Sequence, residues 1–187
     1  MALTAGFDPE QPVIAAIRIG DRHAFSEFVR RHSRWIRGVV FGVLGDADRV
    51  DDIVQQVWSQ AWDRIGDLKD ADRWRPWLYR LARNAALDAG RDETRRKRFR
   101  RTLAESLPSP RPVAAPGDAL LAEERHKAVM DAIRGLPALY REPFVLRHLE
   151  GWNYQQIAEL MQMPVDSVET RLVRARRLLR ESLAGKV

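Results

Sequence analysis

The stretch 151–180, GWNYQQIAELMQMPVDSVETRLVRARRLLR, constrains the fold most, because its pattern predicts two helices that meet at a tight corner. In the first helix, Tyr154, Ile157 and Met161 recur at helical spacing and form one apolar stripe. In the second helix, apolar residues again line one face. A short helix, a turn of about three or four residues and a longer basic helix are typical of a helix-turn-helix, whose second helix enters the major groove of DNA.

The polar face of the second helix is strongly basic. Arginine occupies positions 171, 174, 176, 177 and 180. At about 100° per residue, Thr170, Arg174 and Arg177 point away from the apolar face, and Ser167 lies on their edge. An ordinary helical hairpin with a solvated polar face is the alternative interpretation, but the arginines favour contact with a polyanion. We therefore predict that this face reads DNA.

The composition of the whole chain agrees with a polyanionic partner without proving one. The net charge is +6 and the isoelectric point is about 10.3. Cysteine is absent, which excludes disulfides, thiolate metal sites and cysteine nucleophiles. No apolar run approaches the roughly 20 residues of a membrane span, and the N-terminus lacks the pattern of a signal peptide. We expect a soluble, cytoplasmic protein without membrane insertion.

The sequence offers little for catalysis. It contains no recognisable nucleophile–base pair, metal-binding cluster or glycine-rich phosphate loop, and its four histidines are scattered. An enzyme, such as a helical hydrolase, is the weakest interpretation. We expect no catalytic residues, no metal and no cofactor.

Helical patterns cover most of the remaining chain, and no strand alternation of useful length is present. We expect a loose tail at 1–12, a short apolar segment at 13–19 and helices at the following positions: about 21–44, 47–65, from 73 onward, 118–134 and 137–149. Seven basic residues lie between 91 and 101, and four prolines lie between 107 and 117. The predicted fold class is all-α, with two small helical domains joined by a flexible, Pro-rich basic linker.

Four stretches, taken in order, resemble a bacterial RNA polymerase sigma factor of the extracytoplasmic-function (ECF) group in the sigma-70 family. They are GDRHAFSEFVRRH at 20–32, DRVDDIVQQVWSQAW at 48–62, RWRPWLYRLARNAALD at 73–88, and the longer stretch at 136–181 that ends in the helix-turn-helix. The resemblance covers about 13–183. It implies a region 2 domain at 13–100, a linker at 101–117 and a region 4 helix-turn-helix domain at 118–187.

The resemblance implies that the second stretch docks on core RNA polymerase. The polar residues concerned are Asp51, Asp52, Gln55 and Gln56. Carboxylates and amides on an otherwise apolar helix suit directional hydrogen bonds to an arginine-rich partner. The alternative is a solvated face whose acidic residues complement the helix dipole. A metal or acid–base role for Asp51 and Asp52 is disfavoured, because neighbours in sequence point apart on a helix.

The third stretch and its preceding loop would read and melt the −10 element. The resemblance places a specificity loop at 67–72, a pocket for a flipped base at Asn84, and melted-strand contacts nearby. The residues to which the resemblance assigns these contacts are Asp67, Leu68, Lys69, Asp70, Asp72, Arg80, Arg83 and Asn84. An amide can bond an unstacked base, and arginines can follow the backbone. For Arg80 and Arg83 a solvated basic face is an equal alternative. We expect Trp74 and Trp77 mainly in the core and Tyr79 partly or wholly outside it.

The helix-turn-helix would read the −35 element. The family's base-contacting positions fall on Ser167, Glu169, Thr170, Val173 and Arg174, and Arg171 and Arg177 add basic contacts. The family usually has glycine where this chain has Gln162, which predicts either a left-handed conformation or a different corner. Position 169 is often basic in the family, and a glutamate there predicts a different base preference. Pro143 can kink the preceding helix.

The resemblance therefore implies a promoter-specificity subunit that binds core RNA polymerase and promoter DNA and has no catalytic activity of its own. It also implies an anti-sigma factor as a partner, because members of this group are commonly held inactive by one. A stand-alone helix-turn-helix regulator remains the alternative, although it explains neither the stretch at 48–62 nor the one at 73–88.

Overall fold

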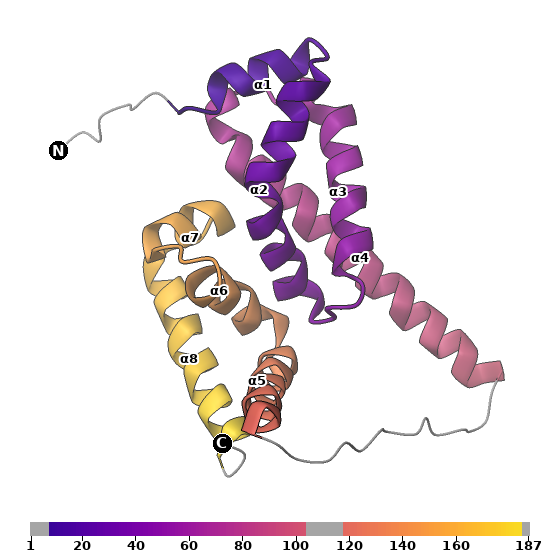
Figure 1. Ribbon diagram of the computed structural model, residues 1–187, viewed down its shortest axis with the longest axis vertical. Coiled ribbons are helices and arrows are strands. Elements are labelled where there is room, and N and C mark those ends of the chain that lie inside the picture. Colours follow the sequence, from indigo (N-terminus) through magenta and orange to yellow (C-terminus); the bar gives the residue numbers. More distant parts are fainter. Residues whose placement is uncertain (1–7, 104–117, 185–187) are drawn as a thin grey trace.

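The computed structural model describes residues 8–103 and 118–184, and their regular elements are all helical. The first group of helices packs as one bundle and consists of α1 (Gln11–Arg18), α2 (Arg22–Leu44), α3 (Val50–Arg64) and α4 (Trp74–Leu103). The second group consists of α5 (Asp118–Gly135), α6 (Ala138–His148), α7 (Tyr154–Met161) and α8 (Val165–Leu183). Two short 3-10 turns, η1 (Ile65–Asp67) and η2 (Ala71–Arg73), connect α3 to α4. The predicted all-α fold with two helical domains is confirmed (Figure 1).

Local chemistry sets both ends of α2, as the sequence predicts. The side chain of Asp21 caps the helix by accepting hydrogen bonds from the backbone N–H groups of His23 and Ala24, at 2.8 and 3.0 Å. Gly45 ends it in the left-handed conformation, with φ of 74°. Between these ends the helix buries one face in the core of the first domain. Fully buried side chains of this core include Phe28, Ile36, Val39, Val40, Val57, Trp74 and Leu78.

The first domain departs from the sequence prediction at its two ends. The helix that starts at Trp74 continues to Leu103, past the expected domain boundary at residue 100. Residues 95–101, the basic run, thus belong to this helix, but the side chains from 96 onward lie outside the described ones. At the other end, residues 8–12 belong to an ordered segment rather than to a loose tail. The linker at 104–117 and the first seven residues lie outside the described part.

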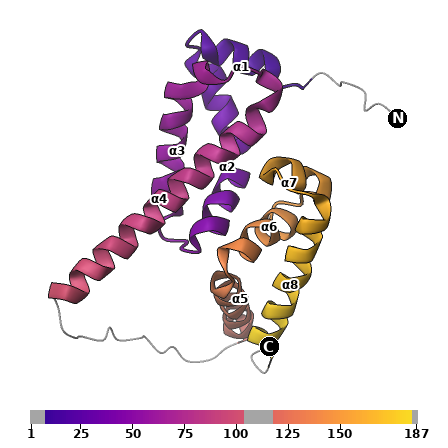
Figure 2. The same ribbon diagram turned by 180° about the vertical axis from the view of Figure 1, so that it is seen from behind.

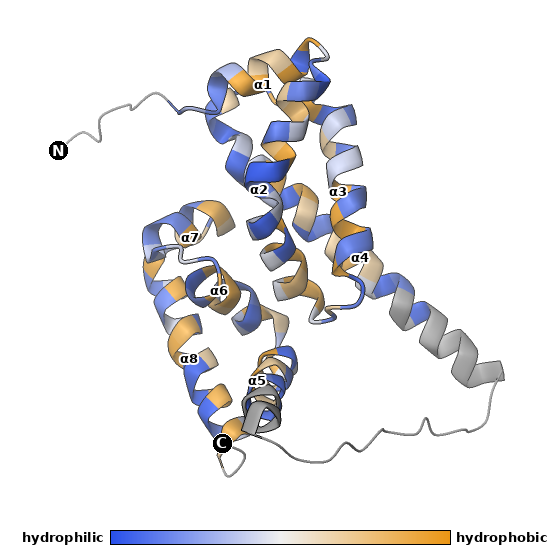
Figure 3. Cartoon of the chain, in the orientation of Figure 1, coloured by the Kyte–Doolittle hydropathy of each residue, from blue (hydrophilic) through white to orange (hydrophobic). Residues whose placement is uncertain are grey.

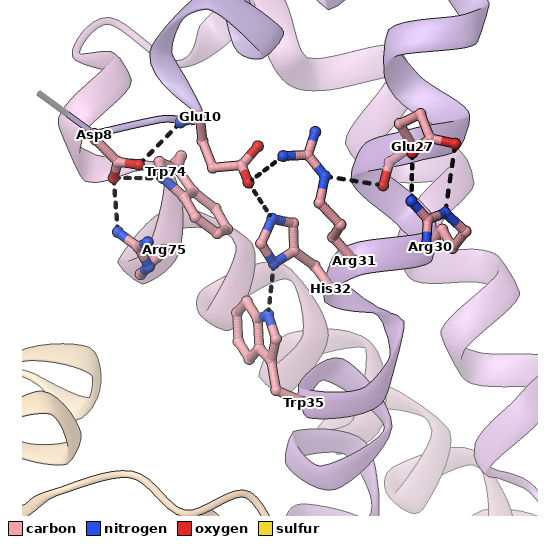
Figure 4. Close-up of polar contacts among 9 residues, drawn as sticks. All are labelled: Asp8, Glu10, Glu27, Arg30, Arg31, His32, Trp35, Trp74 and Arg75. Carbon is pink, nitrogen blue, oxygen red and sulfur yellow. Dashed lines mark hydrogen bonds and ion pairs between the residues drawn. The ribbon is translucent and has the colours of Figure 1, made fainter.

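The segment before α1 is ordered because one partly buried carboxylate, Asp8, and one buried carboxylate, Glu10, hold it (Figure 4). Asp8 accepts hydrogen bonds from the indole N–H of Trp74 at 3.0 Å and from the guanidinium of Arg75 at 2.7 Å. Glu10 is only 5% exposed, and its Oε1 lies 2.8 Å from Nη1 of Arg31 and 3.1 Å from Nε2 of His32. Ordinary sequence patterns do not reveal such a network, because its partners are 21–67 residues apart.

The orientation of His32 follows from its two neighbours. The indole N–H of Trp35 donates to Nδ1 of His32 at 3.3 Å, so Nδ1 must be an unprotonated acceptor. The proton of the neutral imidazole is therefore on Nε2, which faces Glu10. The ring also packs against Phe28 and Trp74, with centroid separations of 4.5 Å in both cases.

In the second domain, α7 and α8 form the predicted corner. A capping box starts α7: Asn153 and Gln156 exchange side-chain to backbone hydrogen bonds, both of 2.9 Å. Gln162 ends it with φ of 54° and ψ of 51°, so of the two alternatives predicted for this position the chain adopts the left-handed conformation. The inner face of α8 is buried through Val168, Leu172, Ala175 and Leu179.

The two domains pack against each other, which the sequence does not predict. Helix α6 lies alongside the C-terminal half of α2, and this is visible from both sides of the molecule (Figures 1 and 2). Gly38 and Gly42 lie in the interior of α2 at this contact. A glycine in a helix interior costs about 0.5–1 kcal/mol relative to alanine, so close approach of another element is a physical reason for it.

Within the described residues no helix has the length and apolarity needed to span a membrane.

The left-handed Gln162 generates a stability prediction. A residue with a Cβ atom costs about 1–2 kcal/mol in this conformation, whereas glycine adopts it freely. We expect Gln162→Gly to raise the free energy of unfolding by about 1 kcal/mol, measured by urea denaturation. The control is Gln155→Gly, an exposed site inside α7, which should lower stability by a similar amount. A lower free energy of unfolding for Gln162→Gly would contradict the left-handed conformation of Gln162.

The His32 network generates a prediction about pH. Burial lowers the pKa of His32 from its ordinary value of 6.5. The carboxylate of Glu10 raises the pKa and so opposes this effect, whereas the charges of Arg31 and Arg75 lower the pKa further. The unfolded chain therefore binds the proton more readily than the folded one. The contribution of neutral His32 to the free energy of unfolding is therefore fully present above about pH 6.5, and it is lost as the pH falls below that value.

The measurement is urea denaturation at several pH values for His32→Gln and for the parent protein. We expect the variant to lose stability less steeply between about pH 6.5 and 5. The control is His126→Gln, at an exposed position of α5, which should keep the parental slope. An unchanged slope in His32→Gln would show that His32 does not titrate in the folded protein as argued.

Candidate nucleic-acid and protein interfaces

The polar residues singled out on α3 share one exposed face. Asp51, Asp52, Gln55 and Gln56 are all exposed, whereas the residues between and beyond them, Ile53, Val54, Val57 and Trp58, are buried. The two aspartates lie in the first turn, where their charge complements the helix dipole. Asp51 also forms an ion pair with Arg37 of α2. Among the described residues, no group of three or more histidine, aspartate or glutamate side chains is arranged to hold a metal ion.

A shallow aromatic groove adjoins this face between α2 and α3. It includes Phe25, Trp58 and Trp62 and reaches Gln55, and its volume is about 450 Å³. Phe25 packs edge-on against both tryptophans, with centroid separations of 6.2 and 5.0 Å. The indole nitrogen of Trp58 is buried and has no hydrogen-bond partner among the residues that the structure describes. Sequence reasoning assigned these side chains to the core, because their helical spacing cannot distinguish a covered apolar face from a partly open one.

The loop between α3 and α4 carries exposed polar residues on a buried anchor. Asp67, Lys69, Asp70 and Asp72 are exposed, whereas Leu68 is only 5% exposed. Asp70 caps η2 by accepting from the backbone N–H of Asp72 at 3.0 Å. Asp72 in turn accepts from the side chain of Gln11. Leu68 therefore fixes the position of the loop from the core. The other four side chains are exposed, and Asp70 and Asp72 each also accept a hydrogen bond within the protein.

The polar residues predicted on α4 divide into two groups. Arg80 and Asn84 are exposed and one helical turn apart, so they share a face. Arg83 is half-buried, and its Nε lies 3.3 Å from Oε1 of Glu142 on α6. Tyr79 was expected partly or wholly outside, but it is only 4% exposed and its hydroxyl donates to the same Glu142 carboxylate. The expectation for Tyr79 is corrected, because the other domain covers this face.

The pKa values of Glu142 and Tyr79 reflect the burial of both side chains. Burial raises the pKa of Glu142, and the hydrogen bond from Tyr79 and the charge of Arg83 only partly offset it. Burial also raises the pKa of Tyr79, and the neighbouring carboxylate adds to the effect. Tyr79 thus remains a protonated donor across the physiological range. Of the residues expected to contact the −10 element, Arg83 is the one held in this way by the second domain.

The polar face of α8 is largely open. Glu169, Thr170, Val173, Arg174 and Arg177 are exposed, and Ser167 and Arg171 are half-buried (Figure 3 shows the alternation of hydrophilic and hydrophobic residues along this helix). The hydroxyl of Thr170 donates to the backbone carbonyl of Asp166 at 2.8 Å. Arg174 donates to the hydroxyl of Tyr140 at 3.4 Å, and Arg177 lies 3.9 Å from Glu181.

An exposed apolar side chain within this charged face is unusual. Val173 is 55% exposed, and the exposed residues one turn away on the same side of α8 include Thr170 and Arg177. The major groove offers donors, acceptors and the methyl group of thymine, and an exposed apolar side chain can contact that methyl. The face can therefore make polar and apolar base contacts together.

Comparison with known families accounts for both domains. Residues 28–96 match the model of sigma-70 region 2, and residues 126–179 match the model of sigma-70, region 4. The chain belongs to the sigma-70 family. The region 2 match covers α3, η1, η2 and most of α2 and α4, and the region 4 match covers the end of α5, all of α6 and α7, and most of α8.

Curated relatives place it in the ECF group. The ECF RNA polymerase sigma-E factor of Haemophilus influenzae is 29% identical over 180 residues, which is 93% of this chain and 95% of that protein. The protein of the same name from Escherichia coli K12 is 29% identical over 184 residues, with coverage of 95% and 94%. The RNA polymerase sigma-H factor of Pseudomonas aeruginosa is 28% identical over 182 residues, 94% of each chain.

Solved structures agree with this ECF sigma factor in fold. The structure of CnrH in complex with the cytosolic domain of CnrY has a TM-score of 0.68 and 25% identity, covering 96% of this chain and 100% of that one. The sigma factor RpoE of Bartonella quintana, in complex with the anti-sigma factor NepR, has a TM-score of 0.62 and 20% identity, with coverage of 87% and 98%. The protein is thus an ECF sigma factor that directs RNA polymerase to promoters, and sigma factors are non-enzymatic initiation factors.

Proposed function

We propose that this ECF sigma factor divides promoter recognition among three of its exposed surfaces. The polar face of α3 docks on core RNA polymerase. The loop before α4, with the outer face of α4, reads and melts the −10 element, and α8 reads the −35 element. The observation that carries the proposal is that the residues at the family's contact positions in these motifs are mostly exposed, while the side chains that alternate with them are buried.

Docking on polymerase would use directional hydrogen bonds. Asp52 and Gln56 are exposed one helical turn apart on α3, and Gln55 joins their face to the aromatic groove of Phe25, Trp58 and Trp62. Carboxylates and side-chain amides accept hydrogen bonds from arginine in defined geometry. An apolar side chain of the partner would cover the aromatic groove, so the surface combines polar specificity with an apolar contact.

Opening of the −10 region would use Asn84, Arg80 and the loop residues Asp67, Lys69, Asp70 and Asp72. The exposed amide of Asn84 can hydrogen-bond the Watson–Crick edge of a base that has left the duplex. Arg80, one turn before it, can contact the strand backbone. Capture of the extruded base offsets the few kcal/mol that unpairing costs, so recognition and melting are coupled.

Reading of the −35 element would use the N-terminal half of α8. Glu169 can accept from the amino group of cytosine, and Val173 can contact a thymine methyl. Arg174 can contact guanine or phosphate, with Tyr140 restricting its side chain. Arg171 and Arg177 add positive charge along the groove.

The domain limits and the remaining partner follow from the same family. We assign region 2 to about 13–100 and region 4 to about 118–187, with a connecting segment between them. CnrH was solved in complex with the cytosolic domain of CnrY, and the Bartonella RpoE in complex with the anti-sigma factor NepR; an anti-sigma factor is a corresponding partner for this chain. The protein would act in the cytoplasm, where transcription occurs.

The docking surface can be tested with one charge-neutralising variant. We expect Asp52→Ala to weaken binding to core polymerase about tenfold, measured by competition against a fluorescently labelled sigma factor, and to lower promoter-directed transcription in parallel. The control is Glu27→Ala, which removes a partly exposed carboxylate of α2 that pairs with Arg30. Asp52→Ala with parental affinity for core would exclude this face of α3 as the docking site.

The −35 assignment predicts an altered base preference. We expect Glu169→Ala to lose about tenfold discrimination at a single −35 position, where the parent prefers cytosine, because a lost base contact costs about 1–3 kcal/mol. The measurement is transcription from promoters with a randomised −35 element. The matched control is Glu181→Ala, which removes the same charge from the far end of α8. Identical preferences in Glu169→Ala and the parent would exclude Glu169 as a base contact.

A further inference from the structure

The loop before α4 packs against an element that neither family model matches. Helix α1 lies against both 3-10 turns, η1 and η2, which bound this loop. Its side chains Ile14 and Ile17 are 0% and 2% exposed, so α1 is part of the core of the first domain. The region 2 match begins at residue 28, after α1 has ended. The support that α1 gives the loop thus lies outside the matched part of the chain.

Two side chains at the start of α1 contact the end of the loop and the start of α4. The side-chain amide of Gln11 donates to Oδ1 of Asp72 in η2. Oδ2 of Asp8 accepts from the indole N–H of Trp74 at 3.0 Å and from the guanidinium of Arg75 at 2.7 Å, as Figure 4 shows. Asp8 and Gln11 therefore hold the junction through which the loop enters α4. Residues 8–11 are called the N-terminal anchor below.

The N-terminal anchor is itself fixed to α2 by its buried carboxylate. Oε1 of Glu10 lies 2.8 Å from Nη1 of Arg31 and 3.1 Å from Nε2 of His32. A buried carboxylate is costly without such partners, so Glu10 is restricted to this position. Helix α2 also packs along α4. The anchor thus connects the loop to two helices whose relative position is set by the core.

These contacts leave the loop in one conformation with its polar side chains still exposed. Gln11 occupies one oxygen of Asp72, and a carboxylate accepts several hydrogen bonds, so Asp72 can also accept from a base. Asp8 keeps Arg75 at the first turn of α4, where its Cζ lies 4.4 Å from the centroid of the Trp74 ring. A loop that is already held in its binding conformation loses less conformational entropy when it captures a base.

We propose that Asp8 and Gln11 are positioning residues for recognition of the −10 element. They act through Asp72, Trp74 and Arg75, which set the conformation of the loop and of the first turn of α4. The inference rests on the proposed assignment of this loop and α4 to the −10 element. A change at either residue alters which −10 sequences are used and how readily they open, and leaves the contacts made by α3 and α8 unchanged.

Two substitutions at Gln11 separate positioning from helix stability. Gln11→Glu keeps the size of the side chain but places a carboxylate beside that of Asp72, whereas Gln11→Lys keeps a donor for Asp72. Position 11 lies in the first turn of α1, where a negative charge favours the helix and a positive charge disfavours it. A merely structural role for Gln11 therefore makes the lysine the more harmful substitution. The positioning role predicts the reverse.

The measurement is transcription by the full-length protein with core polymerase from promoters with a randomised −10 element. We expect Gln11→Glu to lose about tenfold discrimination at one or more −10 positions, because the loop is no longer held in a single conformation. Gln11→Lys should keep the parental −10 preference. Both variants should retain the parental −35 preference and affinity for core polymerase. A parental −10 preference in Gln11→Glu, or a larger change in Gln11→Lys, would overturn the inference.

The role of Asp8 is tested by strand opening. Asp8→Asn removes the charge that faces Arg75 and one acceptor oxygen. Because base capture offsets the cost of unpairing, weaker capture matters most where the strands must still be separated. We expect Asp8→Asn to lower transcription about fivefold from a duplex promoter and by less than about twofold from a promoter whose −10 region is mismatched. Equal losses on the two templates would exclude a positioning role for Asp8.

Ile14→Val is the control for general destabilisation. It shortens a fully buried side chain of α1 and leaves the contacts of Asp8 and Gln11 in place. The free energy of unfolding, measured by urea denaturation, should fall, whereas the −10 preference and the ratio between the two templates should match the parent. A changed −10 preference in Ile14→Val would show that lost stability alone produces the effect, and the inference would then fail.

A variant of the loop itself distinguishes failure of this inference from failure of the proposed function. Asp67→Ala with Lys69→Ala removes two exposed side chains of the loop and leaves the N-terminal anchor intact. If this pair alters the −10 preference and Gln11→Glu does not, the loop assignment holds and the anchor is not a positioning element. If neither alters the preference, the assignment of the loop to the −10 element fails, and the inference about the anchor fails with it.

Discussion

The close packing of α6 on the C-terminal half of α2 is the constraint on which the arrangement of the whole molecule depends. Gly38 and Gly42 give α2 a surface without side chains on one side, while Ile36, Val39 and Val40 bury the other side in the region 2 core. Helix α2 thus packs in the core of its own domain on one side and against the second domain on the other. Gly45 both ends the helix and leaves space for the guanidinium of Arg141, which any Cβ atom would displace.

Two adjacent residues of α6 carry opposite charges into this contact, and they are satisfied to different degrees. Arg141 donates to the carbonyls of Gly42 and Val43 and also to those of Arg134 and Leu136 at the α5–α6 corner, at 2.6–2.9 Å. These acceptors compensate for its burial, as a buried charge requires. Arg141 therefore fixes the corner of its own domain as well as the contact.

Glu142 is less well compensated. Its burial raises the pKa of its carboxyl, and only Tyr79 and Arg83 oppose that effect with hydrogen bonds. A buried ion pair is a weak source of net stability, because loss of hydration offsets much of the attraction. A contact held by such a pair is specific in geometry and adds little to net stability.

The sequence by itself determined the helices, because their causes are local. The elements were predicted from apolar spacing, from the cap at Asp21 and from the helix ends at Gly45 and Gln162. The motifs on α3, α4 and α8 indicated the family. Most polar residues at the family's contact positions are exposed as predicted, since exposure follows from helical periodicity. The N-terminal anchor of Asp8 and Glu10 was missed, because its partners are distant in sequence.

Only the tertiary structure decided which of those exposed faces stay free. Periodicity places Tyr79 and Arg83 on the outer side of α4, and it cannot show that Glu142, 59–63 residues later, covers them. Periodicity also cannot show that the glycines inside α2 pack against the second domain, because a glycine allows close packing only where another element approaches it. Helix formation depends on neighbours along the chain, whereas domain packing depends on the shape and charge of two surfaces, and these exist only once both domains have folded.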